Sequence, residues 1–318
     1  MLFDDCLHRY VITDAIRDEN VLKFSIEYYN VFKSKNEIED LQVEGINKAE
    51  VYESNEYVET VTNYIIANHN RKTHNRTFTA MFCVSSVDML IKYYDLLKQR
   101  KEEGKHNLNI ATIFSYGANE EDKTADGFIA EEDYNLAAEE GSEYKVMPRR
   151  DKLDEYINDF NEIFNTRHSA KDGNAFLNYK KDISKKVRSR QIDVLLVVNM
   201  FLTGFDSKPL NTLYVDKNLQ YHGLIQAFSR TNRILNEKKS QGNILAFRNL
   251  KKATDEAIGL FSDKNAKETI IIAPYEEHLE NFNKAYKLLM SIAPTVNSVN
   301  DLRTEEEELE FAKAFREI

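Results

Sequence analysis

The spacing of hydrophobic and polar positions changes repeatedly between residues 55 and 250. Short apolar runs predict buried strands, and apolar residues at every third or fourth position predict helices. Strands are predicted at 77–84, 108–116, 192–200, 210–216 and 242–247, and a further one within 21–32. Helices are predicted at 56–70, 85–104, 151–164, 175–188 and 221–234. Because strands alternate with helices, the sequence predicts an α/β fold with a mostly parallel sheet flanked by helices.

The pattern differs on either side of this region, which predicts three parts. Residues 1–54 show little periodicity and are expected to form a flank. Residues 251–318 show helical periodicity only, so we expect an all-helical extension there. Within the central part, residues 117–143 carry ten acidic residues and one lysine, which predicts an exposed excursion.

Composition narrows the class of protein. The net charge of -10 means that any contact with DNA must be a local basic patch. The two cysteines, Cys6 and Cys83, lie far apart, so we expect neither a zinc site nor a disulfide framework. The N-terminus carries acids where a signal peptide carries lysines. No apolar run approaches the roughly 18 residues that span a membrane, and we therefore expect a cytoplasmic protein without a membrane partner.

Several catalytic motifs are absent from the sequence. There is no GxxxxGK[ST] phosphate loop, no GxGxxG after a strand, no GxSxG and no HExxH. The seven histidines show no metal-ligand spacing. A hydrolase with a complete active site of its own is hard to build from this chain.

The segment "NMFLTGFDSK" (199–208) follows the most apolar of the predicted strands. In open α/β sheets, ligands bind outside the carboxyl ends of the strands. Thr203, Gly204 and Asp206 place a hydroxyl, a permissive backbone position and a carboxylate together, a set that binds ribose or orients an arginine. A plain turn that leaves the strand is the alternative interpretation.

The segment "YHGLIQAFSRTNR" (221–233) contains two arginines and no acid. On a helix, Gln226, Arg230 and Arg233 fall within about 60° of one another, and Leu224, Phe228 and Thr231 lie roughly opposite. An amphipathic surface helix is one interpretation. The other is a phosphate-binding face, because solvated helices usually mix charges and the guanidinium fork suits phosphate.

A basic run, "KKDISKKVRSR" (180–190), carries six positive residues and one acid. It fits a helix that follows a DNA backbone, which would add a salt-dependent and sequence-independent contribution to binding. It fits a solvated helix face equally well.

The residues just quoted carry a resemblance. "VVNMFLTGFD" followed by "LNTLYVDKNLQYHGLIQAFSRTNRI" resembles the motor (R) subunit of type I restriction enzymes, at helicase motifs V and VI of superfamily 2. The similarity continues through "GNILAFRNL" and "LFSDKNAKETI" and reaches back to "YVITDAIRDENVLKFSIEY". It implies a RecA-like fold, with 55–250 as the second of two motor domains and 1–54 as a flank from the first.

The resemblance assigns roles to the candidate residues. Arg230 and Arg233 match the two arginines of motif VI, which reach ATP phosphates held with Mg²⁺ by the first motor domain. We expect Arg233 to be the arginine finger and Arg230 its partner. Gln226 also falls in motif VI, and Gly204 and Asp206 fall in motif V beside the nucleotide. Ala227 and Ser229 stand where many superfamily 2 helicases carry arginine and glycine, a departure that suits the type I family.

The resemblance also implies DNA contacts. Thr203 falls in motif V, which couples the DNA backbone to the nucleotide cleft. "FCVSSVDM" resembles motif IV, so Ser85 and Ser86 would cap a helix whose N-terminus faces a DNA phosphate. Plain N-capping is compatible with that role.

The whole-protein activity implied is ATP-driven translocation of double-stranded DNA, which leads to cleavage away from the recognition site. The partners implied are methyltransferase (M) and specificity (S) subunits. The Walker A, DExH and nuclease motifs would lie in other parts of a longer protein, so we expect this chain alone to be inactive. Two alternatives are another superfamily 2 DNA helicase or translocase, and a non-enzymatic module that docks a methyltransferase.

Overall fold

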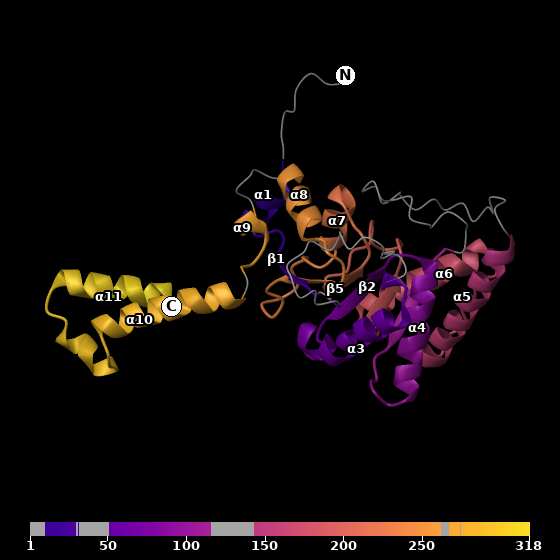
Figure 1. Ribbon diagram of the computed structural model, residues 1–318, viewed down its shortest axis with the longest axis horizontal. Coiled ribbons are helices and arrows are strands. Elements are labelled where there is room, and N and C mark those ends of the chain that lie inside the picture. The colour runs from indigo at the N-terminus through magenta and orange to yellow at the C-terminus, as the bar shows by residue number, and fades with distance from the viewer. Residues whose placement is uncertain (1–9, 30, 32–50, 116–142, 262–266, 274) are drawn as a thin grey trace, which may run out of the picture. The chain divides into compact units, whose positions relative to one another are not determined.

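The computed structural model describes residues 10–29, 31, 51–115, 143–261, 267–273 and 275–318 (Figure 1). The chain divides into two compact units, Met1–Ile271 and Ile272–Ile318. The predicted acidic excursion at 117–143 lies almost entirely outside the described residues, and Cys6 lies outside them too.

The first unit is built on a six-stranded sheet with the strand order β1-β6-β5-β2-β4-β3. Every pair of neighbouring strands is parallel. The strands are β1 (Phe24–Tyr28), β2 (Thr79–Val84), β3 (Ile110–Ile113), β4 (Val194–Val197), β5 (Leu210–Asp216) and β6 (Gly242–Ala246). The predicted parallel α/β fold is confirmed, although β3 and β4 are shorter than the apolar runs that predicted them.

Helices flank this sheet. They are α1 (Ile12–Arg17), α3 (Asn55–Lys72), α4 (Val87–Glu102), α5 (Glu143–Phe164), α6 (Gly173–Arg188), α7 (Tyr221–Phe228), α8 (Lys251–Phe261) and α9 (Lys267–Ile270). Helix α3 contacts α4, and α7 contacts α8 (Figure 1). The apolar stripes that the helical periodicity predicted for α3, α4 and α7 are largely buried.

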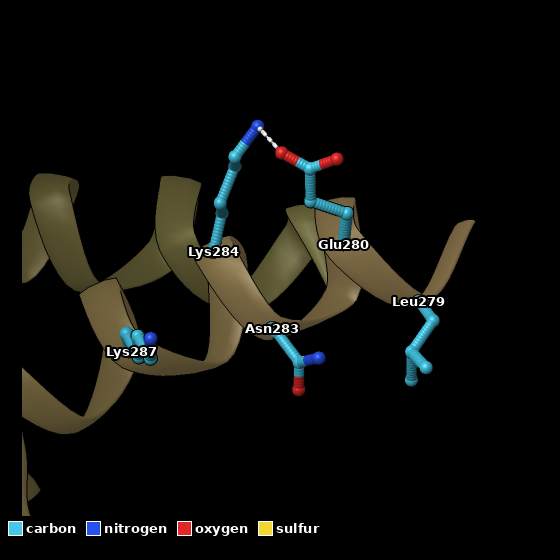
Figure 2. Close-up of a pocket in the computed structure, with 5 residues that line it drawn as sticks. All are labelled: Leu279, Glu280, Asn283, Lys284 and Lys287. Atoms are coloured by element: carbon cyan, nitrogen blue, oxygen red, sulfur yellow. Dashed lines mark ion pairs between the residues drawn. The ribbon is translucent and has the colours of Figure 1, made fainter. Parts of the chain in front are cut away.

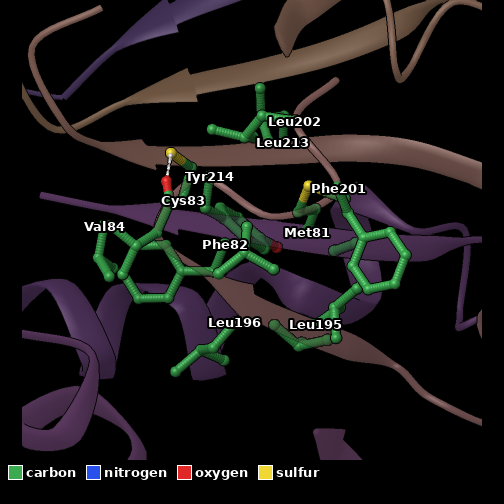
Figure 3. Packing of buried hydrophobic residues seen from close by; sticks show 14 of the residues in the cluster. Met81, Phe82, Cys83, Val84, Leu195, Leu196, Phe201, Leu202, Leu213 and Tyr214 are labelled. Atoms are coloured by element: carbon green, nitrogen blue, oxygen red, sulfur yellow. Dashed lines mark hydrogen bonds between the residues drawn. The ribbon is translucent and has the colours of Figure 1, made fainter. Parts of the chain in front are cut away.

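The core lies in the middle of the sheet, where every residue of β2, β4 and β5 is buried (Figure 3). Strands covered on both faces need no polar alternation, which explains the nearly continuous apolar runs of β2 and β4. Phe201 and Leu202, from the segment after β4, belong to the same buried cluster. Cys83 is a free, buried thiol whose Sγ lies 3.6 Å from the carbonyl oxygen of Val198, and burial raises its pKa to about 12.

The division of the chain differs from the predicted boundaries after residues 54 and 250. Strand β1, within the predicted flank, pairs with β6 and so forms an edge of the sheet. Phe24 is 1% exposed and meets Phe228 edge-on, with ring centroids 6.0 Å apart. The helices α8 and α9 also belong to the first unit. Periodicity could not reveal this, because the contacts join segments about 200 residues apart.

The second unit is helical, as predicted for the end of the chain. It contains α10 (Tyr275–Ile292), a short 3-10 helix (Val296–Asp301) and α11 (Glu305–Glu317), and α10 contacts α11. Thr304 caps α11 in a capping box with Glu307, and four glutamates occupy the first turn, as the helix dipole favours. Among the described helices, none combines the length and apolar character that crossing a membrane requires.

Candidate functional site: an arginine pair at the amino edge of the sheet

The predicted helix over 221–234 is shorter in the structure, because α7 ends at Phe228. The backbone then turns, with the N–H of Arg230 bonded to the carbonyl of Ala227 and that of Thr231 to Phe228. The buried Thr231 side chain donates to the Phe228 carbonyl at 2.8 Å. The N–H of Leu22 donates to the Asn232 carbonyl at 2.8 Å and holds the chain in the turn. Arg230 and Arg233 therefore do not share a helix face with Gln226, and that expectation is wrong.

Tight packing fixes this turn against β6. A Cβ atom added to Gly242 would lie 2.3 Å from Oγ1 of Thr231. A glycine is therefore required at the start of β6, since any larger residue would push the turn away. The structure keeps Arg230 and Arg233 close to each other, but by a turn rather than by helical periodicity.

Arg230 is held by backbone oxygens. Its Nη1 donates to the carbonyl of Phe205 at 2.6 Å, and its Nε donates to the carbonyl of Gln226 at 3.1 Å. Burial, with the nearby charge of Arg233, lowers the pKa of Arg230. The side chain of Gln226 is itself exposed. Arg230 thus joins the end of α7 to the segment after β4.

Arg233 pairs with Asp206. Its Nε lies 3.2 Å from Oδ1 of Asp206, and the two side chains are 46% and 60% exposed. An exposed ion pair of this kind contributes about 1 kcal/mol or less to stability, so it orients the guanidinium more than it stabilises the fold. The sequence predicted that a carboxylate here would orient a neighbouring arginine, and the structure brings these two residues together.

The cluster lies at the amino edge of the sheet, not at the carboxyl edge where the sequence placed Asp206. Arg233 forms an isolated antiparallel bridge with Val21, three residues before β1 begins. The segment 199–208 starts at the carboxyl end of β4 and reaches the amino end of β5, so Asp206 lies across the sheet from its start. A strand of four to seven residues is short enough for a ten-residue segment to cross.

Two left-handed residues shape that segment. Phe201 has φ of +67°, and Gly204 has φ of +66° with no atom within 4 Å of a Cβ added there. Glycine is therefore favoured at 204 by its backbone conformation, not by a close neighbour. Thr203 beside it is half-buried. Left-handed conformations of residues such as phenylalanine are uncommon and occur often at functional sites.

Lys239 also belongs to the cluster, although no sequence pattern pointed to it. Only 2% of the residue is exposed, and its Nζ donates to the carbonyls of Lys208 and Leu210 at 2.7 and 2.8 Å. Burial lowers its pKa to about 7; Asp206 opposes that shift and Arg233 adds to it. Lys239 ties the end of the Asp206 segment to the start of β5.

Arg188, the last residue of α6, reaches the cluster as well. Its Nε donates to the backbone carbonyl of Asp206 at 2.8 Å, and its guanidinium lies 5.6 Å from the ring centre of Phe205. The sequence marked Arg188 only as part of the basic run 180–190. Four cations, Arg188, Arg230, Arg233 and Lys239, therefore surround the segment that carries the carboxylate of Asp206.

Ser85 and Ser86 lie apart from this cluster, at the carboxyl end of β2. Ser86 caps α4 by accepting a hydrogen bond from the N–H of Met89 at 3.2 Å, as predicted. Asp88 occupies the first turn, where Arg149 binds its carboxylate with two hydrogen bonds of 3.1 Å. The helix terminus therefore already has an acid near its positive end. The structure does not bring these serines together with Arg230 and Arg233.

An arginine pair beside one carboxylate binds anions but lacks the parts needed for catalysis alone. Among the described residues there is no group of three or more side chains able to hold a metal ion. The geometry supplies positive charge that can stabilise a phosphate presented from outside the cluster.

Similarity to known proteins decides the family. A family model described as type I restriction enzyme subunit R domain 3 matches residues 76–249, and one described as type I restriction and modification enzyme subunit R C terminal matches 270–318. The chain belongs to the type I restriction enzyme subunit R family. The first match contains β2 to β6 and the arginine cluster, and the second contains the helical unit.

Curated relatives place this R-subunit chain within longer proteins. A type I restriction enzyme endonuclease subunit of Staphylococcus aureus (strain COL) is 44% identical over 318 residues, covering 99% of this chain and 32% of that protein. One from Staphylococcus saprophyticus is 42% identical over 319 residues, with 99% and 32% covered. The chain thus spans about a third of the length of these relatives.

A more distant relative and one solved structure complete the comparison. A putative type I restriction enzyme endonuclease subunit of Methanocaldococcus jannaschii is 24% identical over 261 residues, covering 80% of this chain and 23% of that protein. The crystal structure of the C-terminal part of the Fun30 ATPase domain matches with a TM-score of 0.33 and 8% identity, covering 86% of this chain and 58% of that one. Similarity at that TM-score supports no argument about fold or function.

Proposed function

We propose that this chain is the second RecA-like domain of an ATP-driven translocase of double-stranded DNA, working in the cytoplasm within a type I restriction endonuclease. The observation that carries the proposal is the arginine pair, because Arg230 and Arg233 lie on a fixed turn at the edge of a parallel sheet. In phosphoryl transfer, charge on the transferred group is stabilised by arginines held in place beforehand. A neighbouring domain would hold ATP and Mg²⁺.

Within this proposal Arg233 is the finger and Arg230 its support. The Nε of Arg233 lies 3.2 Å from Oδ1 of Asp206 and the side chain remains 46% exposed, so a phosphate can reach its guanidinium from solvent. Arg230 is more buried and donates to two carbonyls. Gly204, Asp206 and Gln226 would line the nucleotide cleft. Thr203, Ser85 and Ser86 would contact DNA.

Translocation can be tested with the full-length subunit assembled with its M and S partners. We expect ATP hydrolysis to require double-stranded DNA and to increase with the length of DNA beyond the recognition site. A third strand annealed at a distance should be displaced only when ATP is present, after a delay that grows with that distance. Hydrolysis without displacement would contradict the translocase proposal, and the same DNA without a recognition site is the control.

We further propose that the helical unit docks a partner protein, and the observation that favours this is an apolar stripe along α10. Tyr275, Leu279, Phe282 and Tyr286 fall within about 60° on the helix and are 71%, 41%, 45% and 47% exposed. Another face of α10 is already covered, because Ala285 is only 6% exposed and α10 contacts α11. The apolar stripe is therefore not the face that α11 buries. Exposed apolar stripes with a charged rim are typical of protein interaction sites.

A shallow pocket on α10 shows the polar rim beside this stripe (Figure 2). Lys284 pairs with Glu280 at 2.7 Å, and Asn283 and Lys287 line the same pocket beside Leu279. The pocket mixes charges and lies on a single helix, which suits the edge of a protein contact better than a small-molecule site. We infer that the occupant is the M and S assembly.

Removal of the apolar stripe tests the docking proposal. In the full-length subunit, Phe282→Ser with Tyr286→Ser should weaken co-purification with the M and S subunits at least tenfold, because two partly exposed aromatic anchors are removed. Glu277→Ser with Asn281→Ser changes two exposed residues on the opposite side of the same helix and serves as the matched control. Equal assembly by both variants would contradict the proposal.

A further inference from the structure

The basic run 180–190 separates into two faces when it folds. Lys181, Lys185 and Arg188 are exposed and follow one another at i, i+4 and i+7, which places them on one side of α6. We call these three residues the α6 cationic stripe. Leu177, Asn178 and Ser184, which lie beside it on the helix, are uncharged.

Three of the remaining charges of the run, Lys180, Asp182 and Lys186, are half-buried against the protein, and Arg190 follows the end of the helix. His168 Nε2 lies 2.9 Å from a carboxylate oxygen of Asp182, the acid of the run. The ammonium of Lys186 lies over the ring of Phe164, 4.5 Å from its centre, and that of Lys180 lies 5.5 Å from the centre of the Phe201 ring. The fold therefore turns Asp182 away from the stripe, and this face of α6 carries three cations and no acid of its own. A solvated helix face usually mixes both signs instead.

The dimensions of the α6 cationic stripe suit a nucleic-acid backbone. Lys181 and Arg188 are separated by about 10 Å along the helix axis, from the rise of an α-helix. That length corresponds to about three successive phosphates of one strand of B-DNA. The long side chains of the three residues can reach separate phosphates, so the charge complementarity is that of a polyanion rather than of a single small anion.

The stripe ends on the arginine cluster. Arg188 donates from Nε to the Asp206 carbonyl at 2.8 Å, and Asp206 pairs with Arg233 at 3.2 Å. Arg230 donates to the carbonyl of Phe205, the ring of which lies beneath the Arg188 guanidinium. One segment, Phe205–Asp206, thus receives contacts from the stripe on one side and from both arginines on the other.

We propose that the α6 cationic stripe binds the phosphate backbone of duplex DNA and that Arg188 transmits this contact to the Asp206–Arg233 pair. This inference rests on the proposed translocase function and adds to it a DNA surface and a route from DNA to the ATP-facing arginine. Movement of Arg188 toward a DNA phosphate would shift the Asp206 backbone and with it the carboxylate that orients Arg233. Arg188 is a positioning residue in this scheme.

The first experiment measures the salt dependence of DNA binding. The full-length subunit is titrated with a fluorescent duplex of arbitrary sequence at several KCl concentrations, without nucleotide. Each phosphate that a side chain no longer neutralises should make the slope of log K against log salt shallower by about 0.9. Lys181→Gln with Lys185→Gln should therefore reduce the slope by about 1.8. The control, Lys251→Gln with Lys252→Gln, removes two exposed lysines from α8 and should leave the slope unchanged.

Two results would overturn the proposal that the stripe binds DNA. One is an unchanged slope in the Lys181/Lys185 variant, and the other is a failure of the unaltered subunit to bind the duplex at low salt. If the unaltered complex still displaces a third strand, the proposed function stands although this inference fails. A reduction in slope that is equal in the α8 control would also overturn the inference, since it would show a general charge effect. If the Lys181/Lys185 variant lost more affinity for a single-stranded probe than for the duplex, the stripe would be assigned to single strands. That result would contradict the proposed binding of duplex DNA.

The second experiment separates binding from transmission. Arg188→Gln and Lys185→Gln each remove one charge of the stripe, so both should change the salt slope by about 0.9. At saturating duplex, however, Arg188→Gln should lower ATP turnover severalfold, because the Asp206 carbonyl loses its guanidinium donor. Lys185→Gln loses a phosphate contact but leaves the Asp206 contact intact, so its turnover at saturating duplex should exceed that of Arg188→Gln, while the α8 control, Lys251→Gln with Lys252→Gln, should keep full turnover. Equal turnover in the two variants would overturn the role of Arg188.

Discussion

Replacing Arg233 with alanine is expected to reduce DNA-stimulated ATP hydrolysis by the full-length subunit about 10³-fold or more, the range measured for arginine fingers in phosphoryl transfer. The side chain is half-exposed and pairs with Asp206 through Nε, so its removal leaves no buried charge unpaired. Its effect should therefore fall on turnover and not on folding. Steady-state hydrolysis at saturating ATP and duplex measures the loss.

Conservative and distant substitutions sharpen this prediction. Arg233→Lys retains the charge but replaces a planar fork by a point charge, so we expect it to recover only a small part of the turnover. Arg71→Ala removes an exposed arginine from α3 and should leave turnover unchanged. Both variants should assemble normally with the M and S subunits. Full turnover by the Arg233→Ala subunit would rule out Arg233 as the finger.

Substitution of Arg230 is expected to affect stability as well as turnover, unlike substitution of Arg233. The Arg230 side chain is half-buried and its guanidinium donates to the carbonyls of Phe205 and Gln226 at 2.6 and 3.1 Å. Arg230→Ala should thus lower both turnover and stability, the latter by about 1 kcal/mol or more per hydrogen bond removed. A loss of turnover without a loss of stability is the property that distinguishes the finger from its support.

Local pattern was sufficient for the central strands of the sheet and for part of the site. The apolar runs at 77–84, 192–200 and 210–216 predicted β2, β4 and β5, because strands buried on both faces admit no polar alternation. The segments that hold Arg230, Arg233 and Asp206 were also found, from charge imbalance and from their position after a strand. Those signals depend on residues that are close together in sequence.

The errors arise where distant segments meet. The period of α7 continued past Phe228, but Leu22 and Val21 bind the backbone at Asn232 and Arg233 and divert it. Lys239 and Arg188 joined the site through backbone carbonyls of 205–210, which no sequence pattern specifies. The flank at 1–54 contributed a strand for the same reason. Long-range hydrogen bonds override local propensity at each of these positions.

Asp216→Ala is expected to destabilise the first unit by about 3–5 kcal/mol, the range for breaking a buried ion pair by removing one partner. Asp216 is fully buried at the end of β5. Its carboxylate accepts hydrogen bonds of 2.8 Å from the hydroxyls of Tyr57 and Tyr93 and one of 2.5 Å from Nε of Arg248. Alanine would leave the Arg248 guanidinium, which is 7% exposed, without its anion. Urea unfolding followed by circular dichroism measures the loss.

The neighbours of Asp216 provide graded controls. Burial raises the pKa of this carboxyl, while Arg248 and the two tyrosine hydroxyls favour its charged form. Tyr93→Phe removes one of these bonds and should destabilise by about 1 kcal/mol. Asp216→Leu combined with Arg248→Met should be less destabilising than Asp216→Ala alone, because an apolar pair leaves no charge buried. If the double variant were as unstable as Asp216→Ala, the unpaired charge of Arg248 would not be the cause of the lost stability. The network would then stabilise the fold through its hydrogen bonds and its shape.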